Sequence, residues 1–128
     1  MTPFGLGLRA LREEKGMSLK EMAAELHVTP AYLSALEHGH RGKPNKRFLH
    51  KVCQLFGIIW DEAEALEHLA EISHPRVVVD TSGLSARATE VANRLALAIR
   101  DLPDESLERI LQEIAAAEES RREDDRRA

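Results

Sequence analysis

Cysteine, aromatic residues and long apolar runs are all scarce in this chain of 128 residues. The single cysteine, Cys53, excludes a framework of intrachain disulfides. Aromatic residues make up only 4% of the chain, so its core must come from Leu, Ile, Val and Ala, which favours helices. No apolar run approaches the ~18 residues of a membrane span, and no charged-then-apolar leader opens the chain. We therefore expect a cytoplasmic protein.

Charge is distributed unevenly along the chain, although the net value is only −4. Residues 1–57 carry nine Lys and Arg against five acids, whereas residues 58–128 carry nine Arg against 17 acids. Such asymmetry between two halves is typical of a nucleic-acid-binding face followed by an acidic remainder. The alternative is that the charges simply coat solvated helix faces.

The stretch from Ser18 to Gly39 predicts two short helices joined by a tight turn, over residues 19–26 and 30–38. Its apolar residues recur at i, i+3 and i+4 spacings, interrupted once at the turn. Thr29 can cap the second helix, Pro30 suits its first turn, and Gly39 can adopt the left-handed conformation that ends it. This pattern indicates a helix-turn-helix, whose second helix usually enters the DNA major groove.

Residues 4–72 resemble the Cro/C1 (XRE) class of helix-turn-helix regulators. The matching positions are Arg12, Ala23, Val28, Leu33, Leu36, Glu37, Gly39, Pro44 and Leu49. The resemblance implies a five-helix domain, dimeric binding to double-stranded DNA and transcriptional control, with repression as the output. It also implies a structural ion pair between Arg12 and Glu37.

Three features depart from the pattern of this class. Leu19 replaces the usual Gln that holds a phosphate, and the loop after Gly39 is longer than in the phage repressors. His27 replaces the usual turn glycine, so a residue with a side chain must take a positive φ. These departures affect phosphate contacts rather than the fold.

Further helices are expected on both sides of the motif. The sequence predicts helices over residues 4–15, over 46–56 after a cap at Asn45, and over 61–73 from a capping box at Asp61 and Glu64. Ile58, Ile59 and Ile72 are expected on the buried side of the last of these helices, with Trp60 as a packing anchor. The fold class is therefore all-α.

The segment after His74-Pro75 differs from the rest. Residues 76–80, RVVVD, are the only strand-like run, and they either pair with the same segment of a second subunit or form an extended connector. Two amphipathic helices then follow, over 85–102 and from Pro103. We predict a DNA-binding domain (1–73), an extended linker or strand (74–84), a helical dimerisation hairpin (85–119) and a disordered charged tail (120–128).

The hairpin cannot bury both of its apolar stripes alone, so it should pack on the first domain or on a second subunit. We prefer a homodimer. The predicted dimerisation residues are Val77, Val79, Val91, Leu95, Ile99, Leu107, Ile110, Leu111 and Ile114.

The candidate DNA-binding residues lie on the second motif helix and just after it. They are Thr29, Pro30, Ala31, Tyr32, Ser34, Ala35, His38, Arg41, Lys43, Lys46 and Arg47. The resemblance places base contacts at Pro30, Ala31 and Ala35, which are too small to form bidentate pairs with bases. Hydrogen-bonding readout would therefore fall to the polar positions, and DNA shape would supply part of the specificity.

The sequence also allows functions other than DNA binding. His38, His40, His50 and Cys53 are possible ligands of a metal or redox sensor, but Cys53 falls on a core stripe. No catalytic constellation is visible, so we expect neither an enzyme nor a cofactor. Two alternatives stay open: the antitoxin of a toxin–antitoxin pair, whose acidic helices would cover the toxin, and an interaction module that has lost DNA binding.

Overall fold

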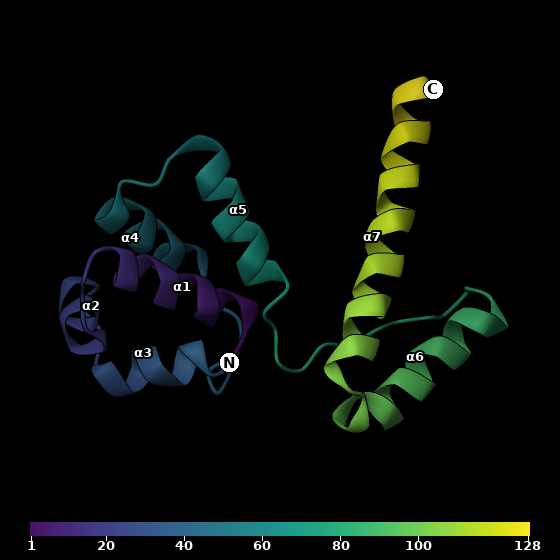
Figure 1. The fold of residues 1–128 in the computed structure, drawn as a ribbon, viewed down its shortest axis with the longest axis horizontal. Helices are drawn as coiled ribbons and strands as arrows, with labels where there is room; N and C mark the ends of the chain where they lie inside the picture. The colour runs from purple at the N-terminus through teal and green to yellow at the C-terminus, as the bar shows by residue number, and fades with distance from the viewer. The chain divides into compact units, whose positions relative to one another are not determined.

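The computed structural model describes all residues 1–128, and they form helices and connecting segments without any strand (Figure 1). The elements are α1 (Pro3–Glu14), α2 (Leu19–Glu25), α3 (Pro30–Glu37), α4 (Lys46–Phe56), α5 (Trp60–Glu71), α6 (Ala86–Ala98), the 3-10 helix η1 (Ile99–Asp101) and α7 (Asp104–Arg127). The all-α prediction is confirmed.

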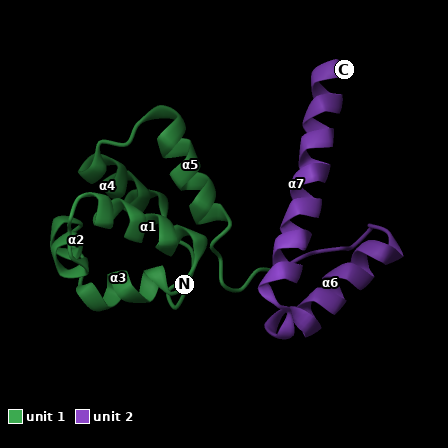
Figure 2. Cartoon of the chain, viewed as in Figure 1, with its two compact units in different colours: residues 1–78 green, residues 79–128 purple.

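The chain divides into two compact units, which are described separately below (Figure 2). Unit 1 comprises Met1–Val78 and holds α1 to α5. Unit 2 comprises Val79–Ala128 and holds α6, η1 and α7.

Unit 1 surrounds one apolar core. α1 packs against α3 and α5, α2 packs against α3, and α4 packs against α5. The fully buried side chains of this core include Phe4, Leu8, Met22, Leu26, Leu33, Leu36 and Val52. Ala23 of α2 is also fully buried.

Short polar side chains fix where the helices begin. The hydroxyl of Thr29 accepts a hydrogen bond from the Tyr32 N–H at 3.0 Å, and the Asn45 side chain accepts one from the Phe48 N–H at 2.8 Å. Each bond satisfies one of the amides that a helix N-terminus leaves free. Both caps were predicted from the sequence. At the turn before α3, His27 has φ 58°, the positive value expected where it replaces the usual glycine.

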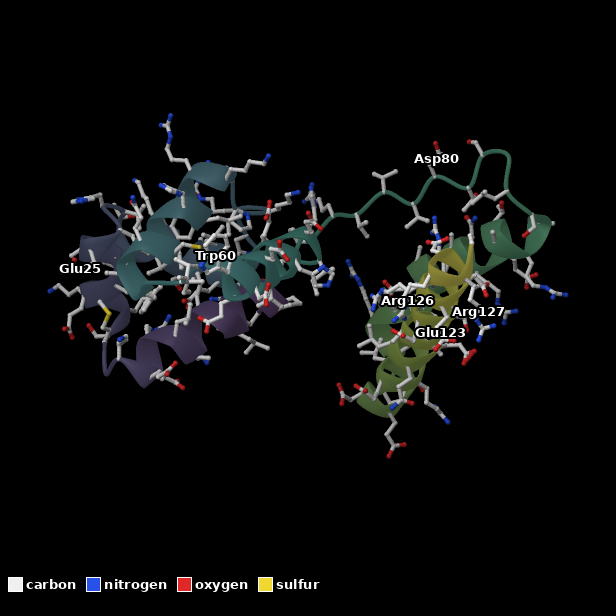
Figure 3. All side chains as sticks on the ribbon, turned by 90° about the horizontal axis from the view of Figure 1, so that it is seen from above. Glu25, Trp60, Asp80, Glu123, Arg126 and Arg127 are labelled. Carbon is white, nitrogen blue, oxygen red and sulfur yellow. The ribbon has the colours of Figure 1, made fainter.

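The start of α5 corrects three expectations. α5 begins at Trp60 rather than after Asp61, and no side chain caps it, so the predicted capping box is wrong. Trp60, labelled in Figure 3, is 82% exposed and takes φ 54°. Ile59 is also exposed, so neither residue packs in the core. The reason is that Ile58 alone turns inward after Gly57, and the next two side chains then face solvent. Ile72, at the end of α5, is likewise exposed.

The strand-like segment forms no strand within the chain. Residues 75–80 have no regular secondary structure, and Val77, Val78 and Val79 are exposed. A strand requires a partner to satisfy its backbone groups, and this chain offers none. Its pairing with a second subunit therefore stays a prediction.

Unit 2 contains no buried residue in any of its helices. A hydrogen bond from the Ala88 N–H to the Ser85 hydroxyl caps α6, and α7 starts directly after Pro103. The two helices follow one another as in the expected hairpin, and they diverge from the turn between them (Figure 1).

The charged tail is helical, which corrects the prediction of disorder for residues 120–128. α7 continues to Arg127, and Glu119 forms ion pairs with Arg122 at 3.3 Å and with Arg126 at 3.2 Å. The pair of Glu119 with Arg122 joins side chains three residues apart, and together with the arginines in the last turn it stabilises a polar helix that buries nothing. No helix of the chain combines the length and the apolar character needed to span a membrane.

Candidate nucleic-acid interface

α3 divides into a buried face and an outward face. Leu33, Leu36 and Glu37 are buried against the core of unit 1. The outward residues include the whole predicted contact set on this helix: Thr29, Pro30, Ala31 and His38 are exposed, and Tyr32, Ser34 and Ala35 are partly exposed. The helix therefore presents its first turn and its far end to solvent.

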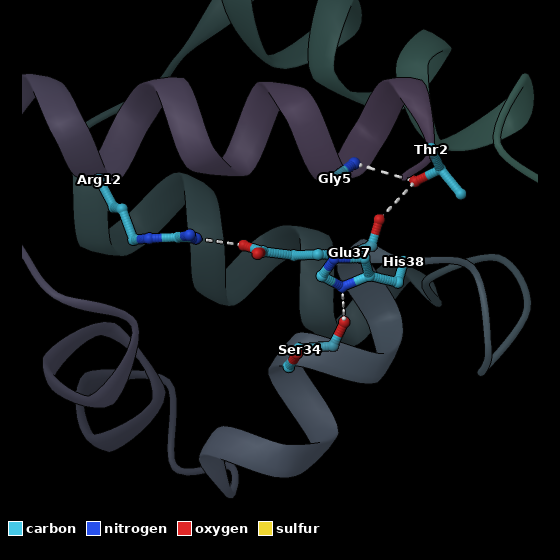
Figure 4. Close-up of polar contacts among 6 residues, drawn as sticks. All are labelled: Thr2, Gly5, Arg12, Ser34, Glu37 and His38. Atoms are coloured by element: carbon cyan, nitrogen blue, oxygen red, sulfur yellow. Dashed lines mark hydrogen bonds and ion pairs between the residues drawn. The ribbon is translucent and has the colours of Figure 1, made fainter.

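A buried ion pair joins α3 to α1. The Arg12 guanidinium donates to Oε2 of Glu37, and the two residues are only 8% and 1% exposed (Figure 4). A buried carboxylate without this partner would carry an uncompensated charge, so the pair fixes one orientation of α3 relative to α1. The structure thus places together the two residues that the resemblance had paired.

The start of α1 holds the end of α3 through backbone contacts. The Thr2 N–H donates to the Glu37 carbonyl at 3.0 Å. The Thr2 hydroxyl accepts from the Gly5 N–H at 3.0 Å and donates to the same Glu37 carbonyl at 3.4 Å (Figure 4). A Cβ at Gly5 would lie only 2.9 Å from Cα of Glu37 and closer still to its carbonyl group. The approach of the two helices therefore depends on glycine at this position.

Two histidines lie at the far end of α3. Nδ1 of His38 is 2.8 Å from the Ser34 carbonyl oxygen, a hydrogen-bond distance (Figure 4). The His38 and His40 rings are stacked, with centroids 6.4 Å apart and an interplanar angle of 14°. The side chain of His38 is thereby oriented along the end of the helix.

Three aromatic rings in successive contact connect the core to the loop after α3. Phe4 contacts Phe48 edge to face at 6.3 Å, and Phe48 contacts Tyr32 in the same way at 6.5 Å. The Arg41 guanidinium then lies over the Tyr32 ring, 5.6 Å from its centroid, a cation–π contact. Arg41 is thus positioned beside α3 although it belongs to a loop.

These contacts frame a cationic hollow, here called the Tyr32 hollow. Its volume is about 550 Å³, and it is lined by His27, Val28, Thr29, Tyr32, Arg41, Asn45, Arg47, Phe48 and Lys51. Three of these residues are basic and none is acidic, and the lining includes the caps of both α3 and α4. A site with cations beside two helix N-termini favours an anion such as a phosphate group.

The structure separates the predicted loop and α4 cations into two groups. Arg41 and Arg47 line the Tyr32 hollow, whereas Lys43 and Lys46 line a different hollow together with Glu67 and Glu71 of α5. The second group thus has acidic neighbours, and its local field is less favourable to an anion.

Sequence reasoning missed Lys51. Its Nζ lies 3.5 Å from the Leu26 carbonyl oxygen, which holds the side chain at the Tyr32 hollow. Lys51 follows Arg47 by four residues, and side chains at this spacing share one helix face. The four-residue spacing between Arg47 and Lys51 therefore predicts that both side chains lie at the same hollow.

The possible metal ligands are not assembled. Nowhere do three or more His, Cys, Asp or Glu side chains gather in an arrangement able to hold a metal ion. Cys53 packs at the margin of the core, where burial, with a smaller contribution from the negative charge of Glu67, raises the pKa of its thiol. A raised pKa is the opposite of what a reactive, redox-sensing thiol requires.

Comparisons with known proteins agree with this geometry. A family model described as "Helix-turn-helix" matches residues 8–61. The HTH-type transcriptional regulator SinR of Bacillus subtilis is 31% identical over 92 residues, covering 66% of this chain and 83% of SinR. The chain belongs to the helix-turn-helix family of transcriptional regulators.

Two further members of the helix-turn-helix family match shorter segments. The HTH-type transcriptional repressor RghR of B. subtilis is 34% identical over 61 residues, which is 48% of this chain and 45% of RghR. The SinR protein of Bacillus licheniformis is 34% identical over 55 residues, which is 43% of this chain and 50% of that protein. The chain thus spans half or less of these two relatives. No solved structure shows significant similarity to it.

Proposed function

We propose that this protein is a sequence-specific DNA-binding repressor that inserts α3 into the major groove. The observation that carries the proposal is the Tyr32 hollow, which gathers Arg41, Arg47 and Lys51 beside the outward face of α3 without any acidic residue. Cations at the flank of α3 support major-groove readout by this helix, because phosphate contacts fix the register of a helix on the duplex.

Few side chains of α3 are available to form hydrogen bonds with DNA bases. Pro30 and Ala31 are exposed at the start of α3 and offer only apolar contacts, such as one with a thymine methyl group. Tyr32 is partly exposed, but its ring supports Arg41. Nδ1 of His38 is engaged with the backbone carbonyl of Ser34, so only Nε2 of this ring and the Ser34 hydroxyl stay available to a base. We therefore assign part of the specificity to DNA shape, read by Arg41.

The same proposal includes a homodimer held by unit 2. Val91, Ile99, Leu111 and Ile114 are all about half or more exposed, as are the linker valines. Exposed apolar side chains that lie together mark an interaction site, and in this proposal a second copy of unit 2 covers them. Two copies would read half-sites about 34 Å apart, and the second contact would form at a high effective concentration.

The test is a fluorescence-anisotropy titration with DNA from upstream of the protein's own gene, beside a scrambled duplex, at two salt concentrations. We expect binding to the upstream DNA at least ~1,000-fold tighter than to the scramble, with both affinities falling as salt rises. Equal, weak binding to both duplexes would reject autoregulation at this site. No binding at low salt would instead support an interaction module.

Charge reversal separates the two groups of cations. Arg47→Glu should abolish detectable DNA binding, whereas Lys46→Glu should weaken it less, because Lys46 lies with Glu67 and Glu71. Both residues are exposed in the first turn of α4, so the pair forms a matched control for folding. Equal effects would show that the Tyr32 hollow is not the phosphate site.

A second candidate is the antitoxin of a toxin–antitoxin pair. Unit 2 favours it, because residues 79–128 carry twelve acids against eight arginines beside the exposed apolar residues. Such a surface suits a basic partner. Stoichiometric co-purification of a small basic protein encoded next to this gene would support the antitoxin, and an isolated homodimer would support the first proposal.

A further inference from the structure

The first residues after α5 pack against the loop that follows α3. A Cβ at Gly39 would lie 3.6 Å from Cβ of Pro75, which is ordinary van der Waals contact. Gly39, His40, Gly42, His74, Pro75 and Arg76 line a common hollow of about 500 Å³. Figure 1 shows the chain leaving α5 beside this loop. The chain therefore leaves unit 1 beside the C-terminal end of α3.

Specific hydrogen bonds determine the position of this exit. Ser73 is buried, and its hydroxyl accepts from the Phe4 N–H at 2.8 Å while donating to the Leu69 carbonyl. The ring of His74 then accepts from the Arg76 N–H at 3.2 Å. Because α1 also holds the Glu37 carbonyl through Thr2, the end of α3 and the start of the linker are attached to the same turn of α1.

Arg76 is an unpaired cation in this place. Its side chain is exposed and takes part in none of the ion pairs of the structure, and no acidic residue lines the hollow to which it belongs. An arginine with free donors is suited to a phosphate, which it can bind through two parallel hydrogen bonds.

The length of α3 indicates what this end of the helix meets on DNA. A helix of eight residues is about 12 Å long at 1.5 Å per residue. The N-terminal residues of a recognition helix contact base edges, so the other end of α3 lies about 12 Å farther along the helix axis, away from those bases. His38, His40 and the adjoining exit of unit 1 are therefore placed to meet the phosphates that border the contacted bases rather than the bases themselves.

We propose that Arg76, which lies outside the helix-turn-helix segment, binds a DNA backbone phosphate beside the end of α3. The linker is in this view part of the DNA interface, and DNA binding fixes the chain just before it enters unit 2. The inference rests on the proposed DNA-binding function and names an additional residue of that site.

The test is the salt dependence of DNA affinity for Arg76→Ala in the full-length protein. One lost phosphate contact per protomer should reduce the magnitude of the slope of log K against log salt by about 0.9, or about 1.8 for a dimer. Affinity for the upstream and the scrambled duplex should fall by the same factor, because phosphate contacts carry no sequence information. Arg76→Lys should restore most of the slope.

Arg87→Ala is the matched control, because Arg87 is also an exposed arginine without an ion pair but lies in α6 of unit 2. If Arg76→Ala and Arg87→Ala leave the slope and the affinity equally unchanged while the wild type binds DNA, the role of Arg76 is rejected and the proposed function stands. If the wild type binds neither duplex at low salt, both proposals are rejected together.

Discussion

The two units of this protein are built from similar amphipathic helices, but only unit 1 buries their apolar stripes within one chain. Leu33 of α3 is fully buried, whereas Leu111 of α7 is 61% exposed. The polar chemistry differs in the same way, since the ion pair of unit 1 is buried and those of unit 2 are exposed. Amphipathic periodicity therefore predicts that a helix has a partner, but not whether the partner belongs to the same chain.

The ion pairs offer the largest contrast between the units. Glu37→Ala should lower the free energy of unfolding by about 3–5 kcal/mol, because it leaves the Arg12 charge buried and unpaired. Glu90→Ala removes the exposed partner of Arg94 and should cost only about 0.3–0.5 kcal/mol. Urea titrations followed by the helical circular-dichroism signal measure both values.

A double substitution distinguishes a lost pair from lost packing. Arg12→Met combined with Glu37→Leu should recover much of the stability that Glu37→Ala loses, because no charge then stays buried. If Glu37→Ala costs no more than Glu90→Ala, the buried pair does not hold α1 to α3 in solution.

Leucine truncations compare the apolar contacts of the two units. Leu33→Ala should cost about 2–5 kcal/mol at any protein concentration, since its cavity forms inside one chain. The cost of Leu111→Ala should instead rise with protein concentration if its partner is a second copy, as the proposed homodimer requires. Urea titrations over a range of concentrations, together with sedimentation velocity, check both. A concentration-independent cost for Leu111→Ala would mean that unit 2 buries this residue by itself.

Two glycines of α1 test the close approach of helices in unit 1. Gly5→Ala should cost about 1–3 kcal/mol or more, because its Cβ would overlap the backbone of Glu37. Gly7→Ala should be nearly neutral, because its Cβ would meet only the end of the Leu69 side chain, at 3.0 Å, and alanine favours the helix by about 1 kcal/mol. Thermal unfolding of the two variants gives the comparison directly, and equal melting temperatures would contradict it.

The smallest expected effect concerns the thiol of Cys53. Burial raises its pKa above the ordinary value of 9.0, so the folded protein holds less thiolate than the unfolded chain as pH rises toward and past that value. Alkylation by iodoacetamide at pH 8 should therefore be slower in the native protein than in urea, and stability should decline slightly above pH 9. Faster alkylation of the native protein would indicate a reactive cysteine.

Local chemistry made most of unit 1 predictable from sequence. Thr29 and Asn45 cap helices because a short polar side chain reaches the free amides of the first turn, whichever fold surrounds them. The pairing of Arg12 with Glu37 was implied by family resemblance instead, since nothing in a separation of 25 residues brings the two together. Trp60 was misjudged because large aromatic residues are usually buried, and only the path of the chain between Gly57 and α5 turns it outward.

The sequence alone determined most of the helices, the capped starts of α3 and α4 and the order of basic and acidic halves. These features depend on neighbours within one or two turns. Tertiary structure decided which distant groups share a site. In the folded chain the Arg41 guanidinium lies over the Tyr32 ring, and Lys43 and Lys46 lie near Glu67 and Glu71 of α5. Arg76 lies beside the loop at the end of α3. Periodicity carries no information about such neighbours, since they result from the packing of α1, α3 and α5 around a common core.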